Sequence, residues 1–239
     1  MTIPRSISFA LLFSKSLAGF GAGAAGMLIL LIFALIGIGT VGAGEVTGPF
    51  LTFAALIMGF ITALITNCLG VFVFGLVDRV RYQNLRGILE HVLILNILIF
   101  IFLLPIYFFV ILGSEQSLQT IFLVTTLQLL SSAQASVLVL ELMGSTNARD
   151  NLIAVYGMVF GLLASIVINL LLYNIGQNFS SAAELAVGGS GGKGATIVLF
   201  AILPVTWFFF GFWPTAIEMF YRWVYEVWGI DFLNREQSS

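Results

Sequence analysis

Charged residues are scarce in this chain of 239 residues, making up 8% of the sequence against roughly 25% in soluble globular domains. Hydrophobic residues make up 60% of it. So few charges cannot cover the surface of a soluble protein of this size. The composition therefore excludes the soluble class and predicts an integral membrane protein, with the lipid bilayer as its surroundings.

Cysteine and histidine each occur once, as Cys68 and His91. A single cysteine excludes an internal disulfide framework. A single histidine excludes bis-histidine haem ligation, and the sequence VLIL that follows His91 does not match the HExxH motif of zinc proteases. No aspartate lies in a predicted span, so a Ser-His-Asp triad lacks a member. We therefore expect no catalytic residues, no metal and no cofactor, and an intramembrane enzyme is the weakest of the three function classes considered.

Basic residues are also few, and they are scattered along the chain. The nine Lys and Arg residues leave a net charge of −2. They form no basic patch of the kind that nucleic-acid-binding proteins show. We expect no nucleic acid among the partners.

Six apolar stretches are long enough to cross a bilayer, which takes about 20 residues. The expected spans are approximately 17–42, 50–77, 88–112, 118–142, 152–175 and 195–214. They predict an all-α bundle, because a lone helix satisfies its own backbone hydrogen bonds in lipid. We expect a single transmembrane domain over residues 1–239. Residues 4–16 and 215–233 are predicted to lie along the interface, the latter as an aromatic-rich helix.

The positions of the basic residues predict the orientation. If the N-terminus is cytoplasmic, only Lys193 of the nine basic residues falls on the outer side. This agrees with the excess of Lys and Arg that cytoplasmic loops carry. We expect both termini in the cytoplasm and the cell membrane as the location.

The segment GFGAGAAG (19–26) contains the GxGxxG spacing of a dinucleotide-binding loop, with Glu45 at a suitable distance. That loop requires a strand before it and a βαβ unit around it, and neither is predicted. We expect no nucleotide. Gly19, Gly23 and Gly26 instead predict close helix packing, since small residues let another helix backbone approach.

The fifth span carries a second row of small and polar residues at four-residue spacing. Gly157, Gly161, Ser165 and Asn169 fall on one helical face. One interpretation is a tight helix interface with hydrogen bonds from Ser165 and Asn169. The other is a solute path along this face.

The fourth span is the most polar. Thr125, Gln128, Ser132 and Ser136 lie within a narrow arc, and Gln134 occupies an adjoining face. Because lipid cannot satisfy these groups, this helix should face the bundle interior or water. Structural hydrogen bonding and a hydrated solute groove both explain the pattern.

Ionisable residues near the spans are default functional candidates. Glu90, His91, Glu141 and Glu218 all fall near the predicted cytoplasmic boundary. We expect them to be solvated groups there, with Arg79 or Arg86 available as partners for the carboxylates. No acid or base is predicted at the membrane centre, which argues against a pump that works through a buried carboxylate.

Two functions remain. The leading hypothesis is a small-solute transporter or a membrane subunit of a transport complex, and Pro105 and Pro204, which interrupt spans three and six, support it. The candidate path residues are Asn67, Asn96, Thr125, Gln128, Ser132, Gln134 and Asn169. The alternative is a non-catalytic scaffold or assembly subunit that packs through its glycine-lined faces. Its partners would be a second copy of the chain or other membrane subunits.

Overall fold

The computed structural model describes residues 8–42, 48–112, 118–145, 148–178 and 193–229. The helices are α1 (Phe9–Gly42), α2 (Gly48–Val77), α3 (Leu85–Leu112), α4 (Leu118–Met143), α5 (Ala148–Asn178) and α7 (Lys193–Trp228). Within the described ranges, all six helices are long and apolar enough to cross a membrane. The predicted all-α, six-span class is confirmed, and the protein is a multi-pass membrane protein.

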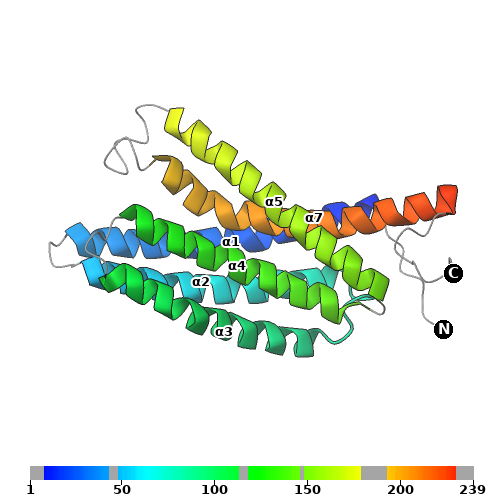
Figure 1. Cartoon of the computed structure of the whole chain (residues 1–239), viewed down its shortest axis with the longest axis horizontal. Helices are drawn as coiled ribbons and strands as arrows, with labels where there is room; N and C mark the ends of the chain where they lie inside the picture. Colours follow the sequence, from blue (N-terminus) through cyan, green and yellow to red (C-terminus); the bar gives the residue numbers. More distant parts are fainter. Residues whose placement is uncertain (1–7, 43–47, 113–117, 146–147, 179–192, 230–239) are drawn as a thin grey trace.

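The helices form an elongated bundle. Helices α1 to α4 run along its long axis, and α5 crosses α7 on one side of that group (Figure 1). The start of α1, the α2–α3 turn, the end of α4 and the C-terminal end of α7 all lie at one end of the bundle (Figure 1). We call it the Arg81 end, after a residue in the α2–α3 turn. The even number of crossings therefore returns α7 to the end at which α1 begins.

Large apolar side chains cover the outside of the bundle. On α3 the exposed residues include Leu98, Ile101, Phe102, Phe108 and Phe109. In water such a surface would be a strong aggregation hazard, because soluble monomers rarely expose large contiguous apolar patches. It is the surface that a bilayer would cover.

Helices α1 and α7 approach each other closely through glycines. A Cβ atom added at Gly19 would overlap the backbone carbonyl of Trp207, and one added at Gly23 would overlap that of Leu203. In the opposite direction, a Cβ atom at Gly211 would lie 2.5 Å from the carbonyl oxygen of Lys15. These glycines therefore face a helix of the same chain.

Helix α5 packs on α7 through its own row of small residues. A Cβ atom at Gly157 would lie 2.5 Å from the Cα of Pro214. Farther along the same face, the hydroxyl groups of Ser165 and Thr206 are 2.6 Å apart. The side-chain amide of Asn169 donates to the backbone carbonyl of Ser165 at 2.8 Å. In the structure Gly157 and Ser165 of this row contact α7, whereas Asn169 bonds to its own helix.

Aromatic and aliphatic side chains fill the centre, where α7 meets α2. The buried Trp207 ring lies against Phe74, with ring centroids 5.4 Å apart. A Cβ atom at Gly70 would enter the space of the Trp207 ring. Because Gly70 has no side chain, the indole of Trp207, the largest side chain of the core, fits between α2 and α7.

Where the structure describes them, the segments predicted to lie along the interface are continuous with the first and last helices. Residues 9–16 form the first turns of α1, and residues 215–228 continue α7 without a break past Pro204 and Pro214. Pro214 packs against Gly157, so the last part of α7 is held by α5. Residues 4–7 and 230–233, together with Glu45, lie outside the described residues.

Candidate functional site

A group of charged side chains from four parts of the chain meets at the Arg81 end of the bundle. Lys15 Nζ of α1 lies 2.9 Å from Glu141 Oε1 of α4. Arg81, in the α2–α3 turn, places one terminal nitrogen 2.7 Å from Glu141 Oε2 and the other 2.9 Å from Glu218 Oε2 of α7. We call these four residues, with Tyr82, the charge cluster. It ties α1, α4 and α7 to the α2–α3 turn.

The charge cluster is almost completely removed from solvent. The side chains of Lys15 and Glu141 are 0% exposed, and those of Arg81 and Glu218 are 6% and 8% exposed. Within the cluster two cations face two carboxylates, and Arg222 also pairs with Glu218 at 3.1 Å. Buried charges require this kind of pairing, because removing one partner from such a pair costs about 3–5 kcal/mol.

A tight turn places Arg81 and Tyr82 at the end of the bundle where the charged residues of α1, α4 and α7 meet. After α2 ends at Val77, the backbone NH groups of Arg81 and Tyr82 both donate to the carbonyl oxygen of Asp78, at 3.1 Å each. The turn reverses the chain so that Tyr82 points inward, where it is buried. Its hydroxyl donates to Glu141 Oε1 at 2.5 Å and accepts from Lys15 Nζ at 2.9 Å.

The surroundings shift the pKa values of both turn residues upward. Burial raises the pKa of Tyr82 well above its usual value near 10, and the negative charge of Glu141 raises it further. Burial opposes the charge on Arg81, but the carboxylates of Glu141 and Glu218 outweigh it, so the pKa of Arg81 is raised. The turn therefore keeps a protonated phenol and a charged guanidinium against the carboxylates.

A row of buried polar residues follows one face of α4 inside the bundle. This polar row consists of Thr125, Gln128, Ser132 and Ser136, all of them buried. At about 1.5 Å per residue it covers roughly 17 Å, more than half of the thickness of a bilayer's hydrocarbon core. The prediction that this face of the fourth span points into the bundle agrees with the burial of its side chains.

Side chains from α2 and α3 hydrogen-bond to the polar row. Asn67 Nδ2 donates to Asn96 Oδ1 at 2.7 Å, and Asn96 Nδ2 donates to Ser136 Oγ at 2.9 Å. Nearer the far end, the Tyr107 hydroxyl donates to Gln128 Oε1 at 2.6 Å. The predicted path residues Asn67, Asn96 and Gln128 thus belong to one polar interior shared by α2, α3 and α4.

Several buried oxygen atoms in the described part of the chain have no hydrogen-bond partner. Three of them belong to α2, namely Thr62 Oγ1, Thr66 Oγ1 and Asn67 Oδ1. Thr62 and Thr66 are four residues apart and so share a helical face. An unpartnered buried polar group costs about 1–3 kcal/mol, which makes these oxygens places where water or a solute would gain hydrogen bonds.

Other predicted site residues lie apart from this interior. Gln134 is only half-buried. Asn169 is buried on α5, where its amide bonds to Ser165, and it does not belong to the polar row. Glu90 and His91 are exposed near the start of α3, where Glu90 pairs with Arg86 at 3.0 Å and His91 Nδ1 lies 2.7 Å from the Gly87 carbonyl.

The expectation of solvated boundary groups is wrong for Glu141 and Glu218. Both are buried and ion-paired, because Lys15 and Arg81 reach them from elements distant in the sequence. Sequence reasoning missed Lys15, Arg81 and Tyr82 as site residues. The available signal was the lone Lys15 within the apolar run FALLFSKSLAGF, which is costly in lipid unless the charge is paired.

The site contains acids, bases and hydroxyl groups but no metal-ligand arrangement. Among the described residues, no three His, Cys, Asp or Glu side chains are grouped closely enough to hold a metal ion. Comparison of the chain with protein-family models, curated proteins and solved structures found no match. What the arrangement offers chemically is hydrogen bonding and charge pairing inside a membrane-spanning bundle.

Proposed function

We propose that the protein transports a small polar solute or a small cation through the interior between α2, α3 and α4. The observation that carries this proposal is the buried polar row of α4, which lies along the helix between the charge cluster and the opposite end of the bundle. Polar residues inside a membrane bundle are costly, and they commonly mark a substrate or ion pathway. The proposed orientation places both termini in the cytoplasm, with the charge cluster at the inner side.

The unpartnered oxygens support a solute-binding role for this interior. The Asn67 side-chain oxygen and the hydroxyl groups of Thr62 and Thr66 are buried without a hydrogen-bond partner. The Asn67 oxygen can only accept, so it suits a cation or a solute that donates hydrogen bonds. A threonine hydroxyl can either donate or accept, and that of Thr66 faces Gly26 of α1.

The charge cluster supports an inner gate for the same path. Glu141 lies on α4 five residues beyond Ser136, the last residue of the polar row, and it pairs with Lys15 and Arg81. With these side chains buried and in contact, the inner end is closed. Opening requires Lys15 and Arg81 to separate from Glu141 and to regain water or new partners.

Flux through proteoliposomes tests the proposal. We would measure uptake of Na⁺, K⁺ and glycerol by the purified chain, then repeat it with Gln128→Leu and with Gln134→Leu. Gln128 lies in the polar row, whereas Gln134 is half-buried on the adjoining face of the same helix. Each variant therefore removes one side-chain amide. That of Gln128 lies inside the proposed path, and that of Gln134 lies outside it. We expect Gln128→Leu to abolish flux and Gln134→Leu to retain it.

A chemical measurement separates loss of the path from loss of the fold. A cysteine at Ser132, in a Cys68→Ser background, reports whether water enters the polar row. We expect a membrane-impermeant thiol reagent to modify it during flux. Equal flux of all three probes in both glutamine variants, or a Ser132→Cys protein that transports but never reacts, would contradict the proposed path.

The scaffold alternative is favoured by a different observation. The hydrogen bonds among Asn67, Asn96 and Ser136 join three helices, as purely structural bonds would. However, Gly19 and Gly157 face α7 of the same chain and are not open to another subunit. A scaffold would have to use another surface. Absence of flux for every probe, together with stable co-purification of a membrane partner, would establish this alternative instead.

A further inference from the structure

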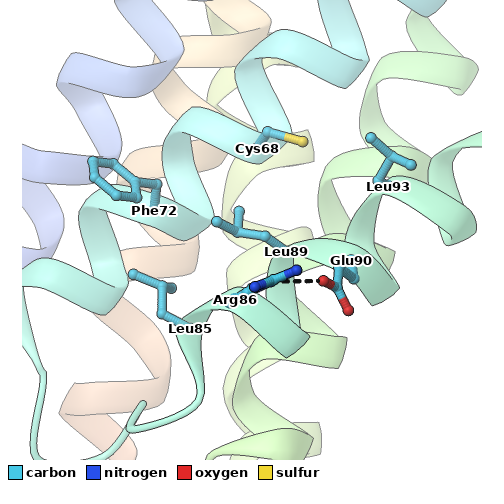
Figure 2. Close-up of a pocket in the computed structure, with 7 residues that line it drawn as sticks. All are labelled: Cys68, Phe72, Leu85, Arg86, Leu89, Glu90 and Leu93. Atoms are coloured by element: carbon cyan, nitrogen blue, oxygen red, sulfur yellow. Dashed lines mark hydrogen bonds and ion pairs between the residues drawn. The ribbon is translucent and has the colours of Figure 1, made fainter.

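A groove lies between α2 and α3 on the outside of the bundle, close to the Arg81 end. It has a volume of about 520 Å³. Seven residues line it, two on α2 and five on α3: Cys68, Phe72, Leu85, Arg86, Leu89, Glu90 and Leu93 (Figure 2). The floor of the groove is apolar, because five of the seven side chains are hydrophobic or carry a thiol. The other two, Arg86 and Glu90, are charged and form the rim of the groove.

The groove lies at the level where a membrane boundary is expected. Leu85 is the first residue of α3, and Leu93 is eight residues farther along. At about 1.5 Å per residue, the groove therefore extends roughly 12 Å from the start of the helix into its apolar part. Phe72 and Leu93 are exposed, so the groove opens on the surface that meets lipid. An acyl chain is the apolar group available at that position.

One oppositely charged pair borders the groove. Arg86 Nε and Glu90 Oε1 are 3.0 Å apart, one helical turn from each other, and the pair lies beside Leu89 (Figure 2). The Arg86 side chain is 92% exposed and that of Glu90 is 61% exposed. The rim thus presents a cation and an anion together, both accessible from outside the protein.

We propose that this groove binds a phospholipid with an ethanolamine headgroup. One acyl chain occupies the apolar floor between Cys68 and Leu93. The lipid phosphate accepts hydrogen bonds from the guanidinium of Arg86, which suits the planar donor geometry of arginine. The primary ammonium of the headgroup donates to the carboxylate of Glu90. The paired charges of the rim match the paired charges of this headgroup.

The same rim discriminates against other common lipids. A choline headgroup carries no N–H donor, so it cannot form the hydrogen bond to Glu90. A glycerol headgroup leaves the lipid with a net negative charge, which Glu90 repels. The site is independent of the polar row inside the bundle, so it does not rest on the proposed transport function.

Lipid titration of the delipidated full chain, followed by native mass spectrometry, tests the proposal. The probes are phosphatidylethanolamine, phosphatidylcholine and phosphatidylglycerol with identical acyl chains. We expect phosphatidylethanolamine to be retained about threefold better than phosphatidylcholine, the ratio typical of one exposed ion pair. Glu90→Gln should remove that preference, and Arg86→Gln should weaken retention of both lipids.

Two controls assign these effects to the groove. Arg79→Gln removes an exposed basic residue near the same boundary that does not line the groove, and it should change nothing. Cys68 is the one cysteine of the chain and lies in the groove, so its alkylation rate reports occupancy independently. Phosphatidylethanolamine should slow that reaction, and Leu93→Trp, which fills the groove, should reduce retention of all three lipids.

Three results would overturn the proposal. The first is equal retention of the three lipids by the unaltered protein, and the second is stronger retention of phosphatidylglycerol, which would identify an anionic-lipid site instead. The third is an unchanged preference in Glu90→Gln protein whose elution profile shows that it is folded.

Discussion

Lys15 and Glu141 form an ion pair of 2.9 Å in which neither side chain is exposed. The pair joins the first turns of α1 to the end of α4, and Tyr82 hydrogen-bonds to both members. Arg81 adds a second cation against the same carboxylate. Glu141 is therefore the central anion of the charge cluster, and its negative charge holds two buried cations.

Replacing that anion should destabilise the protein severely. Glu141→Gln keeps the shape of the side chain but leaves Lys15 and Arg81 facing a neutral amide. We expect a loss of about 3–5 kcal/mol in unfolding free energy, as for other broken buried ion pairs. Glu90→Gln, the same substitution at an exposed pair, is the matched control and should change stability little. Unfolding in detergent micelles measures both, and similar stability of the two variants would refute the central role of Glu141.

The Tyr82 phenol should make the protein sensitive to alkaline pH. Folding raises the pKa of Tyr82, so the folded state holds this proton more tightly than the unfolded state does. This contribution to stability is complete below about pH 10 and is lost as pH rises through the raised pKa. In a series of melting temperatures, Tyr82→Phe should be less stable at pH 7, because two hydrogen bonds are lost. Its decline above pH 10 should be shallower than that of the unaltered protein. Parallel curves would show that Tyr82 does not contribute to the alkaline transition.

Neighbouring glycines of α1 should respond in opposite ways to the same substitution. A Cβ atom at Gly23 would collide with the backbone of Leu203 and Pro204, whereas one at Gly21 would meet nothing within 4 Å. We expect Gly23→Ala to destabilise by about 1–3 kcal/mol through overpacking. Gly21→Ala should be neutral or stabilising, because alanine is the better helix former by about 1 kcal/mol. Equal melting temperatures for the two variants would be inconsistent with the α1–α7 contact.

The orientation can be tested with single cysteines in a Cys68→Ser background. Arg79, exposed in the α2–α3 turn, should become reactive from the cytoplasmic side when changed to cysteine. A cysteine at Lys193, at the start of α7, should react from the outside. Labelling intact cells with an impermeant maleimide, before and after permeabilisation, measures both. Arg79→Cys labelling without permeabilisation would reverse the proposed orientation.

Hydropathy predicted the helices well, because the length of an apolar run is a local property. Span four was expected at 118–142, and α4 covers Leu118–Met143. The inward polar face of α4 was also predictable, since lipid cannot satisfy Gln128 or Ser132. The helical spacing alone places these residues on one face of the helix, without knowledge of which helices pack against it.

The charge cluster could not be predicted in the same way. Lys15 and Glu141 are 126 residues apart, and nothing in the local sequence of either indicates the other. Their meeting depends on which helices become neighbours and on how the turn at Asp78 aims Arg81. Without those partners, solvation was the reasonable expectation for Glu141. The row at Ser165 shows the same limit, because its spacing defined a face but did not identify Thr206 as its partner.

The contacts of α7 also determine the stage of synthesis at which the helix bundle can finish packing. Helix α1 emerges from the ribosome long before α7, yet the backbone that Gly19 and Gly23 approach belongs to α7. Arg81 likewise precedes its partner Glu218 by 137 residues. A nascent chain that stops before α7 therefore leaves the glycine face of α1 without its helix partner, and Arg81 without one of its two glutamate partners.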